Sequence, residues 1–135
     1  MKKLLLLPLL VLPLAACTPS QGVKPRMYAG NSAEILTAIS QIATTIQPLG
    51  GYDYFSVTEV TPTQVTVRAN PTIGMQFLAG NQPITATFTA LQSGNSTSVS
   101  HFAKLGTNAV TPSSAVDTRI ENVYKELATR FTMLP

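Results

Sequence analysis

The stretch ITATFTAL, residues 84–91, has the most regular pattern in this chain of 135 residues. Small or large apolar side chains alternate with threonines, so that Ile84, Ala86, Phe88 and Ala90 share one side and Thr85, Thr87 and Thr89 share the other. Successive side chains of a strand point to opposite faces, and the pattern therefore predicts a β-strand with one buried and one solvated face.

Further strands are predicted on both sides of this stretch. They cover residues 52–60, 64–69, 72–78 and 97–105, and turn residues such as Asn-Pro, Thr-Pro and Ser-Gly-Asn-Ser separate them. The segment 72–78 alternates only weakly, through Ile73, Met75 and Phe77, and residues 79–83 are expected to form a loop. Short turns favour antiparallel neighbours, so we expect an antiparallel sheet of four to five strands.

Two helices are predicted to flank these strands in the sequence. Apolar residues recur at helical spacing from Asn31 to Gln47, and Asn31 with Glu34 forms a capping-box arrangement. A second apolar stripe predicts a helix from about Ser114 to Met133. A sheet with one apolar face needs a cover, which two amphipathic helices supply. The expected fold class is therefore α+β, a two-layer sandwich with the N-terminal and C-terminal helices on one face of the sheet.

The chain begins with a short basic region and an apolar run of eleven residues, 4–14, that two prolines interrupt. A membrane-spanning helix needs about 20 apolar residues, so this run is too short to cross a bilayer. A basic start, a short apolar run and small residues after it are typical of a secretory signal peptide, which is removed from the mature protein.

The end of this segment, Leu14-Ala15-Ala16-Cys17, resembles the lipobox of bacterial lipoproteins. In that family a diacylglycerol alkylates the cysteine sulfur and a dedicated peptidase cuts before the cysteine. The resemblance implies removal of residues 1–16, lipidation of Cys17 and attachment to a lipid bilayer, because two or more acyl chains hold a protein stably on a membrane. Thr18 in place of an aspartate favours the outer membrane, facing the periplasm, if the host has two membranes.

Composition narrows the remaining possibilities. Residues 17–30 contain the lipidated cysteine and a stretch rich in proline and glycine, which predicts a flexible tether, and residues 31–135 are expected to form a single domain. Removal of Lys2 and Lys3 with the signal peptide leaves seven basic and six acidic residues. This balance provides no basic face for nucleic acid. The only cysteine is used by the lipid, so neither disulfides nor thiol chemistry are expected in the domain.

His101 is the only histidine and the only candidate for catalysis. Ser100 is its neighbour, and Asp53 and Asp117 complete a possible Ser-His-Asp set. However, no serine lies in a G-x-S-x-G motif, and adjacent strand residues point to opposite faces. We expect His101 to be an exposed or half-buried strand residue. One histidine and scattered carboxylates predict no metal site, and no motif predicts a cofactor.

Five residues are candidates for a binding surface, namely Tyr52, Tyr54, Thr85, Thr87 and Thr89. Tyrosines often anchor partners, and a neutral threonine row can dock with little desolvation cost. The alternatives are core packing for the tyrosines and an ordinary solvated sheet face for the threonines.

The expected function is that of a non-catalytic envelope lipoprotein that binds a protein partner or assists an envelope assembly. The alternative is a small extracytoplasmic hydrolase that uses His101.

Overall fold

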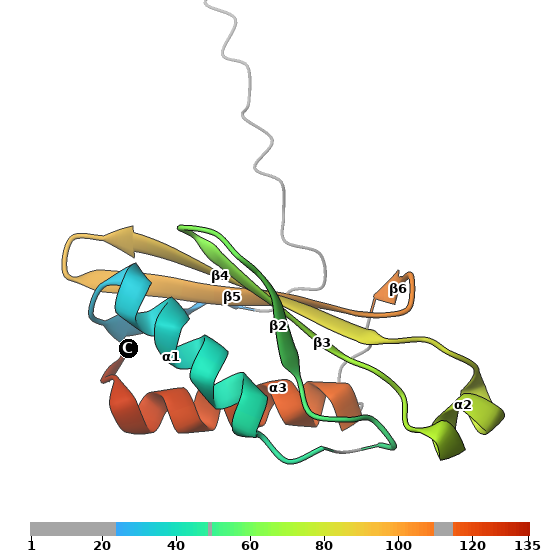
Figure 1. The fold of residues 1–135 in the computed structure, drawn as a ribbon. Coiled ribbons are helices and arrows are strands. Elements are labelled where there is room, and N and C mark those ends of the chain that lie inside the picture. The colour runs from blue at the N-terminus through green and yellow to red at the C-terminus, as the bar shows by residue number, and fades with distance from the viewer. Residues whose placement is uncertain (1–23, 49, 110–114) are drawn as a thin grey trace, which may run out of the picture.

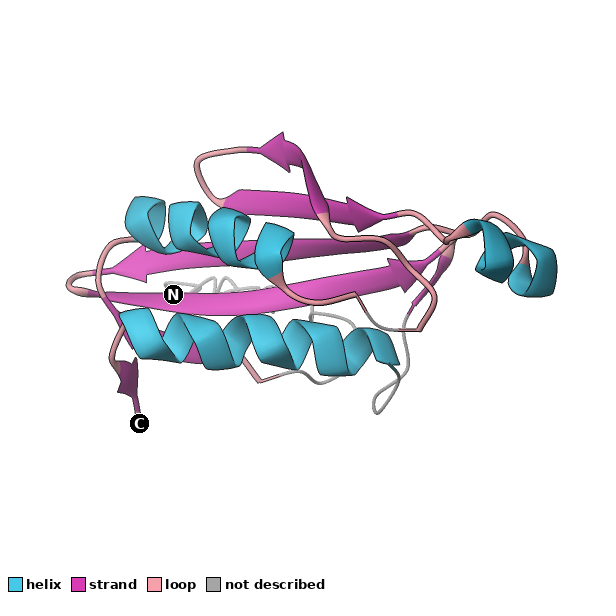
Figure 2. Ribbon diagram, turned by 60° about the horizontal axis from the view of Figure 1, so that its bottom comes forward, coloured by secondary structure: helices cyan, strands magenta, loops and turns pink. Residues whose placement is uncertain are grey.

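The computed structural model describes residues 24–48, 50–109 and 115–135. An antiparallel sheet forms one layer, and the two long helices α1 (Ser32–Thr45) and α3 (Ala115–Arg130) form the other (Figure 1). Both helices lie across the same face of the sheet (Figure 2). The predicted α+β two-layer architecture is confirmed.

The sheet has more strands than the four to five expected. They are β1 (Arg26–Ala29), β2 (Ser56–Val60), β3 (Gln64–Ala69), β4 (Ile84–Ser93), β5 (Ser96–Leu105), β6 (Asn108–Ala109) and β7 (Met133–Leu134). Their order across the sheet is β2-β3-β4-β5-β1-β7, with β6 paired to the end of β5. The additional strands are short segments at the ends of the chain and after β5, which carry too few residues to show an alternation.

The hairpin of β4 and β5 forms the centre of the sheet. Its pairing runs from Ile84 opposite Leu105 to Ser93 opposite Ser96, and Gly94 allows the tight turn with a φ of 60°. The apolar residues of β4 at positions 84, 86, 88 and 90 are at most 1% exposed, whereas its threonines are half-buried. The alternation that predicted this strand is therefore confirmed in its burial.

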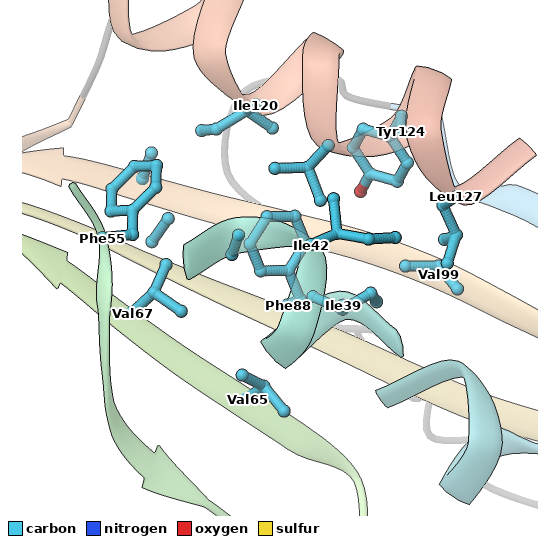
Figure 3. Close-up of a cluster of buried hydrophobic side chains, with 14 of the residues drawn as sticks. Ile39, Ile42, Phe55, Val65, Val67, Phe88, Val99, Ile120, Tyr124 and Leu127 are labelled. Atoms are coloured by element: carbon cyan, nitrogen blue, oxygen red, sulfur yellow. The ribbon is translucent and has the colours of Figure 1, made fainter. Parts of the chain in front are cut away.

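The core lies between the sheet and the helices. In Figure 3 the side chains of Phe88 from the sheet, Ile39 and Ile42 from α1, and Tyr124 and Leu127 from α3 meet in this layer. The predicted cap of α1 is present, because the Asn31 side chain accepts a hydrogen bond of 2.8 Å from the backbone N–H of Glu34.

The prediction of a tether through residue 30 is wrong for residues 26–29, which form β1. This strand pairs with β5 on one side and with β7 on the other, and Tyr28 is fully buried. The sequence did not indicate it because only one of its four residues, Tyr28, is buried. The folded unit therefore begins before Asn31.

The prediction of a strand over residues 72–78 is also wrong. These residues form the short helix α2 (Ile73–Ala79), which lies beyond one end of the sheet between β3 and β4 (Figure 1). The apolar residues Ile73 and Phe77 are four apart, a spacing that fits one face of a helix as well as one face of a strand. Gly80, with a φ of 77°, ends the helix.

Two predicted boundaries shift. The strand expected over residues 52–60 is regular only as β2, and Tyr52 makes an isolated bridge to Pro71. The last helix ends at Arg130 rather than Met133, which is paired in β7. Its predicted start at Ser114 lies outside the described residues.

Candidate functional site

The five residues predicted as a binding surface do not lie on one surface. Tyr52 is buried, with 6% of its area exposed, and belongs to the core. Tyr54 is 48% exposed and donates a hydrogen bond of 3.2 Å to Gln47, just after α1, so it belongs to the helix side of the molecule. The three threonines alternate with the buried residues of β4 and point to the opposite face.

The threonines belong to a larger set of hydroxyl side chains on the face that the helices leave uncovered (Figures 1 and 2). Cross-strand pairing places them together, and we call the set the hydroxyl face: Thr66, Thr85, Thr87, Thr89, Ser98 and Ser100. The Thr66 and Thr87 hydroxyl oxygens lie 3.0 Å apart in a hydrogen bond, and Gln64 donates a hydrogen bond of 3.2 Å to Thr89. The centre of this face is thus polar but uncharged.

Apolar side chains border the hydroxyl face. Phe102 lies opposite Thr87 in the sheet, and Ser98 lies opposite both Leu91 and Met27. Leu91 is 57% exposed. Charged side chains border it too: Glu59 lies opposite Thr66, and Arg68 and Lys104 lie opposite Thr85. The Lys104 ammonium group lies 5.4 Å from the centroid of the Phe102 ring. A partner that covers the hydroxyl groups but leaves these charges at the rim of the contact avoids most of the cost of stripping water from them.

His101 lies on the other face of β5, toward α3. Its Nδ1 is 2.9 Å from the Tyr124 hydroxyl group, and its ring packs beside Phe88 at a centroid distance of 6.1 Å. Burial lowers the pKa of His101, and the charge of Asp117 partly opposes this shift. Burial also raises the pKa of Tyr124 well above its usual value. Near neutral pH the pair therefore consists of a neutral imidazole and a neutral phenol.

Phe88, His101 and Tyr124 form a cluster of rings, which we call the histidine cluster. On its solvent side lies an ion pair between the sheet and α3. Arg26 of β1 lies 2.5 Å from the Glu121 carboxylate, and its guanidinium group stacks on the Tyr124 ring at 4.1 Å. Desolvation alone would lower the pKa of Arg26, but its hydrogen bond to Glu121 and the carboxylate charge outweigh that effect and raise it. These contacts fix β1 against α3.

The possible Ser-His-Asp set is only partly brought together. Asp117 is close enough to His101 to influence its pKa. Ser100 belongs to the hydroxyl face, on the opposite side of the sheet from His101. The backbone N–H of Asp53 is bonded to Asn70, at the end of β3. His101 Nδ1 and the Tyr124 hydroxyl group therefore satisfy each other, and the side chain of the neighbouring Ser100 points to the opposite face.

Sequence reasoning missed Arg119, which is fully buried. Its Nη2 donates a hydrogen bond of 3.0 Å to the carbonyl oxygen of Asp53, and its guanidinium group stacks on Phe55 at 4.0 Å. Within the described ranges its Nε and Nη1 atoms have no hydrogen-bond partner, and burial lowers its pKa. A helical wheel could have flagged it, because Arg119 is three residues after the buried Val116 and shares its inward face.

Metal-ligand clusters and membrane-spanning helices are both absent from the described residues. Across residues 24–48, 50–109 and 115–135, no group of three or more histidine, cysteine, aspartate or glutamate residues could hold a metal ion. In those same ranges, every helix is too short or too polar to cross a bilayer.

Comparison with models of protein families, with curated proteins and with solved structures gave no match to this chain.

Proposed function

We propose that this chain is a lipid-anchored, non-catalytic module of a bacterial envelope that binds a protein partner through the hydroxyl face. The sequence Leu14-Ala15-Ala16-Cys17 supports the anchor. The acyl chains on Cys17 would hold the domain at a membrane surface, and the sheet would present its uncovered face to a partner there.

The observation that carries the binding half of this proposal is the unequal covering of the sheet. Both long helices pack on one face, and the other face carries six half-buried hydroxyl side chains with Leu91 and Phe102 beside them. The charged residues at its border are Glu59, Arg68 and Lys104. Docking on such a face replaces water on hydroxyl groups, which cost far less to desolvate than charges.

The histidine cluster supports a structural rather than a catalytic role for His101. Its Nδ1 is engaged by a buried tyrosine and its ring packs against Phe88. A general base needs an acceptor nitrogen within reach of a substrate proton, and Nδ1 is already occupied by the Tyr124 hydroxyl group. Only Nε2 could serve, and only in the tautomer in which Nδ1 donates to Tyr124.

The proposal is tested by photo-cross-linking in intact bacteria. A photoreactive amino acid replaces Thr89 on the hydroxyl face or, as the matched control, Thr44, which is an exposed threonine on α1. We expect a discrete cross-linked protein from position 89 and none from position 44.

The second part of this experiment introduces a positive charge at the centre of the hydroxyl face. Thr87→Lys should remove the cross-link formed from position 89, because docking would bury an unpaired ammonium group. Thr44→Lys should leave it unchanged. Equal cross-linking from both positions, or insensitivity to Thr87→Lys, would contradict a partner at the hydroxyl face.

A further inference from the structure

The most exposed large apolar side chains of the described residues are all on α2. Ile73, Phe77 and Leu78 have 74%, 87% and 85% of their areas exposed, and we call these three the apolar tip. A small soluble domain gains no stability from side chains that remain in water, so their clustering at one point indicates a contact made elsewhere.

The structure holds α2 firmly enough to present these side chains outward. The backbone N–H and the hydroxyl group of Thr72 both donate hydrogen bonds to the Gly51 carbonyl oxygen, at 2.8 and 2.9 Å. Met75 is half-buried and packs so closely on Gly51 that an added Cβ there would lie 3.2 Å from it. The inner side of α2 is therefore fixed by Met75, while Phe77 and Leu78 extend into solvent.

The charges around the tip suit a membrane surface. No aspartate, glutamate, lysine or arginine occurs between Arg68 and Lys104 in the sequence. These two exposed cations both lie opposite Thr85, at the end of the sheet from which α2 extends. The nearby loop adds one exposed carboxylate, Asp53. An uncharged apolar projection with cations behind it matches the order of acyl region and anionic headgroups in a bilayer.

The direction of β1 points the chain that precedes it toward the same end of the sheet. Arg26 pairs with Val99 and Ala29 with Ser96, so the chain before Arg26 leaves the sheet toward the α2 end. From Val99 to Leu105, at that end, is about 20 Å. The nine residue-to-residue steps from Cys17 to Arg26 can span up to about 30 Å. Cys17 can therefore reach past the end of the sheet, to the level of α2.

We infer that the apolar tip inserts into the bilayer surface to which Cys17 is attached. This inference rests on the proposed lipid anchor and goes beyond it, because it gives the domain a second membrane contact and an orientation. Inserted side chains at one end of the sheet would hold the strands away from the membrane and leave the hydroxyl face accessible.

Fluorescence quenching by spin-labelled lipids tests the inference on the full mature protein purified from bacterial membranes. Gly74→Cys places a thiol in α2, where an added Cβ meets no atom within 4 Å. Ser93→Cys is the matched control, an exposed site at the last residue of β4, next to the hairpin turn at the opposite end of the sheet. Each is labelled with an environment-sensitive dye and placed in phosphatidylethanolamine–phosphatidylglycerol vesicles.

We expect lipid-borne quencher to reduce the emission of the label at position 74 about twofold more than that at position 93. Phe77→Ser combined with Leu78→Ser should lower quenching at position 74 to the control level. Leu91→Ser removes an exposed leucine beside the hydroxyl face and should leave quenching at position 74 unchanged.

The number of dye molecules bound to each chain distinguishes a failure of membrane insertion by the apolar tip from a failure of the lipid anchor at Cys17. One label per chain with equal quenching at positions 74 and 93 overturns insertion while leaving the anchor intact. Two labels per chain mean that the Cys17 thiol is free, which contradicts the anchor and the inference together. A label at position 74 that is protected from aqueous iodide but not reached by lipid quencher indicates a protein contact, and this also overturns insertion.

Discussion

Phe88 links the two layers of the fold. It is fully buried, and its ring lies beside Tyr124 of α3 at a centroid distance of 6.0 Å. Removing a buried phenylalanine side chain costs about 3–5 kcal/mol, which is a large part of the stability of a small domain. We therefore predict that Phe88→Ala leaves the domain barely folded in chemical denaturation.

Leu91, three residues later on β4, is the matched control for that variant. It is 57% exposed, so Leu91→Ala should change the free energy of unfolding by about 0.5 kcal/mol or less. Similar losses for the two variants would contradict the assignment of the buried face of β4.

His101 makes the stability of the domain dependent on pH. Burial lowers its pKa in the folded chain below the value of about 6.5 that histidine has when unfolded. The facing charges are Asp117 and Glu121, which oppose the shift, and Arg26, which adds to it. The unfolded state therefore takes up the proton first, and stability falls as the pH drops below about 6.5 toward the lower folded-state pKa.

The measurement is the free energy of unfolding of the wild type and of His101→Gln between about pH 8 and pH 5, the range that spans the unfolded pKa. We predict a steeper loss of stability with falling pH in the wild type than in the variant. Parallel curves would show that His101 has the same pKa in both states.

Single residues differ in how far the sequence reveals their role. The Asn31 cap was predictable because its partner is three residues away. Arg119 was not, since it bonds to the carbonyl oxygen of Asp53, which is 66 residues distant. Tyr52 and Tyr54 are alike in sequence context, and only the path of the loop before β2 decides that one is buried and the other exposed.

Among the secondary structure elements, β1 contributes more than its four residues suggest. It pairs with two strands, buries Tyr28 and carries Arg26, which forms the ion pair with Glu121. We predict that a chain starting at Lys24 folds cooperatively and that one starting at Asn31 is strongly destabilised or unfolded. Thermal melts of the two chains test this, and equal melting temperatures would contradict a structural role for β1.

Alanine substitutions at two glycines of the α2 region are predicted to change the free energy of unfolding in opposite directions. Gly74 lies inside the helix with open space around it, so Gly74→Ala should stabilise the domain by about 0.5–1 kcal/mol. Gly80 also has open space but a φ of 77°, so Gly80→Ala should destabilise it. Chemical denaturation measures both, and two changes of the same sign would show that α2 does not have this backbone conformation.

The elements that the sequence predicted correctly are those with local and repeated patterns. Ten-residue β4 and 14-residue α1 each repeat their pattern over several turns or pleats. Seven residues in α2 and four in β1 do not, and their conformations depend on what lies next to them in space. The weakly alternating segment 72–78 has no partner strand and contains the helix α2. The segment 26–29, which was predicted to be part of a tether, is the strand β1.

For the whole molecule, the two-layer fold follows from one strongly amphipathic strand and two amphipathic helices. The order of the strands could not be predicted, because β1 and β7 come from opposite ends of the chain, and β7 pairs with β1, which in turn pairs with β5. The set of residues on the hydroxyl face was only half predictable for the same reason. Alternation identified its threonines, but the serines of β5, and the packing of both long helices on the other face, depend on the assembled sheet.

The most direct test of a lipid-anchored module is the intact mass of the protein recovered from bacterial membranes. We predict a chain that begins at Cys17 and carries the mass of a diacylglycerol, with or without a further acyl group. Cys17→Ser should keep residues 1–16 and carry no lipid. A wild-type chain with an unmodified Cys17, or one cut at another residue, would contradict the lipid anchor.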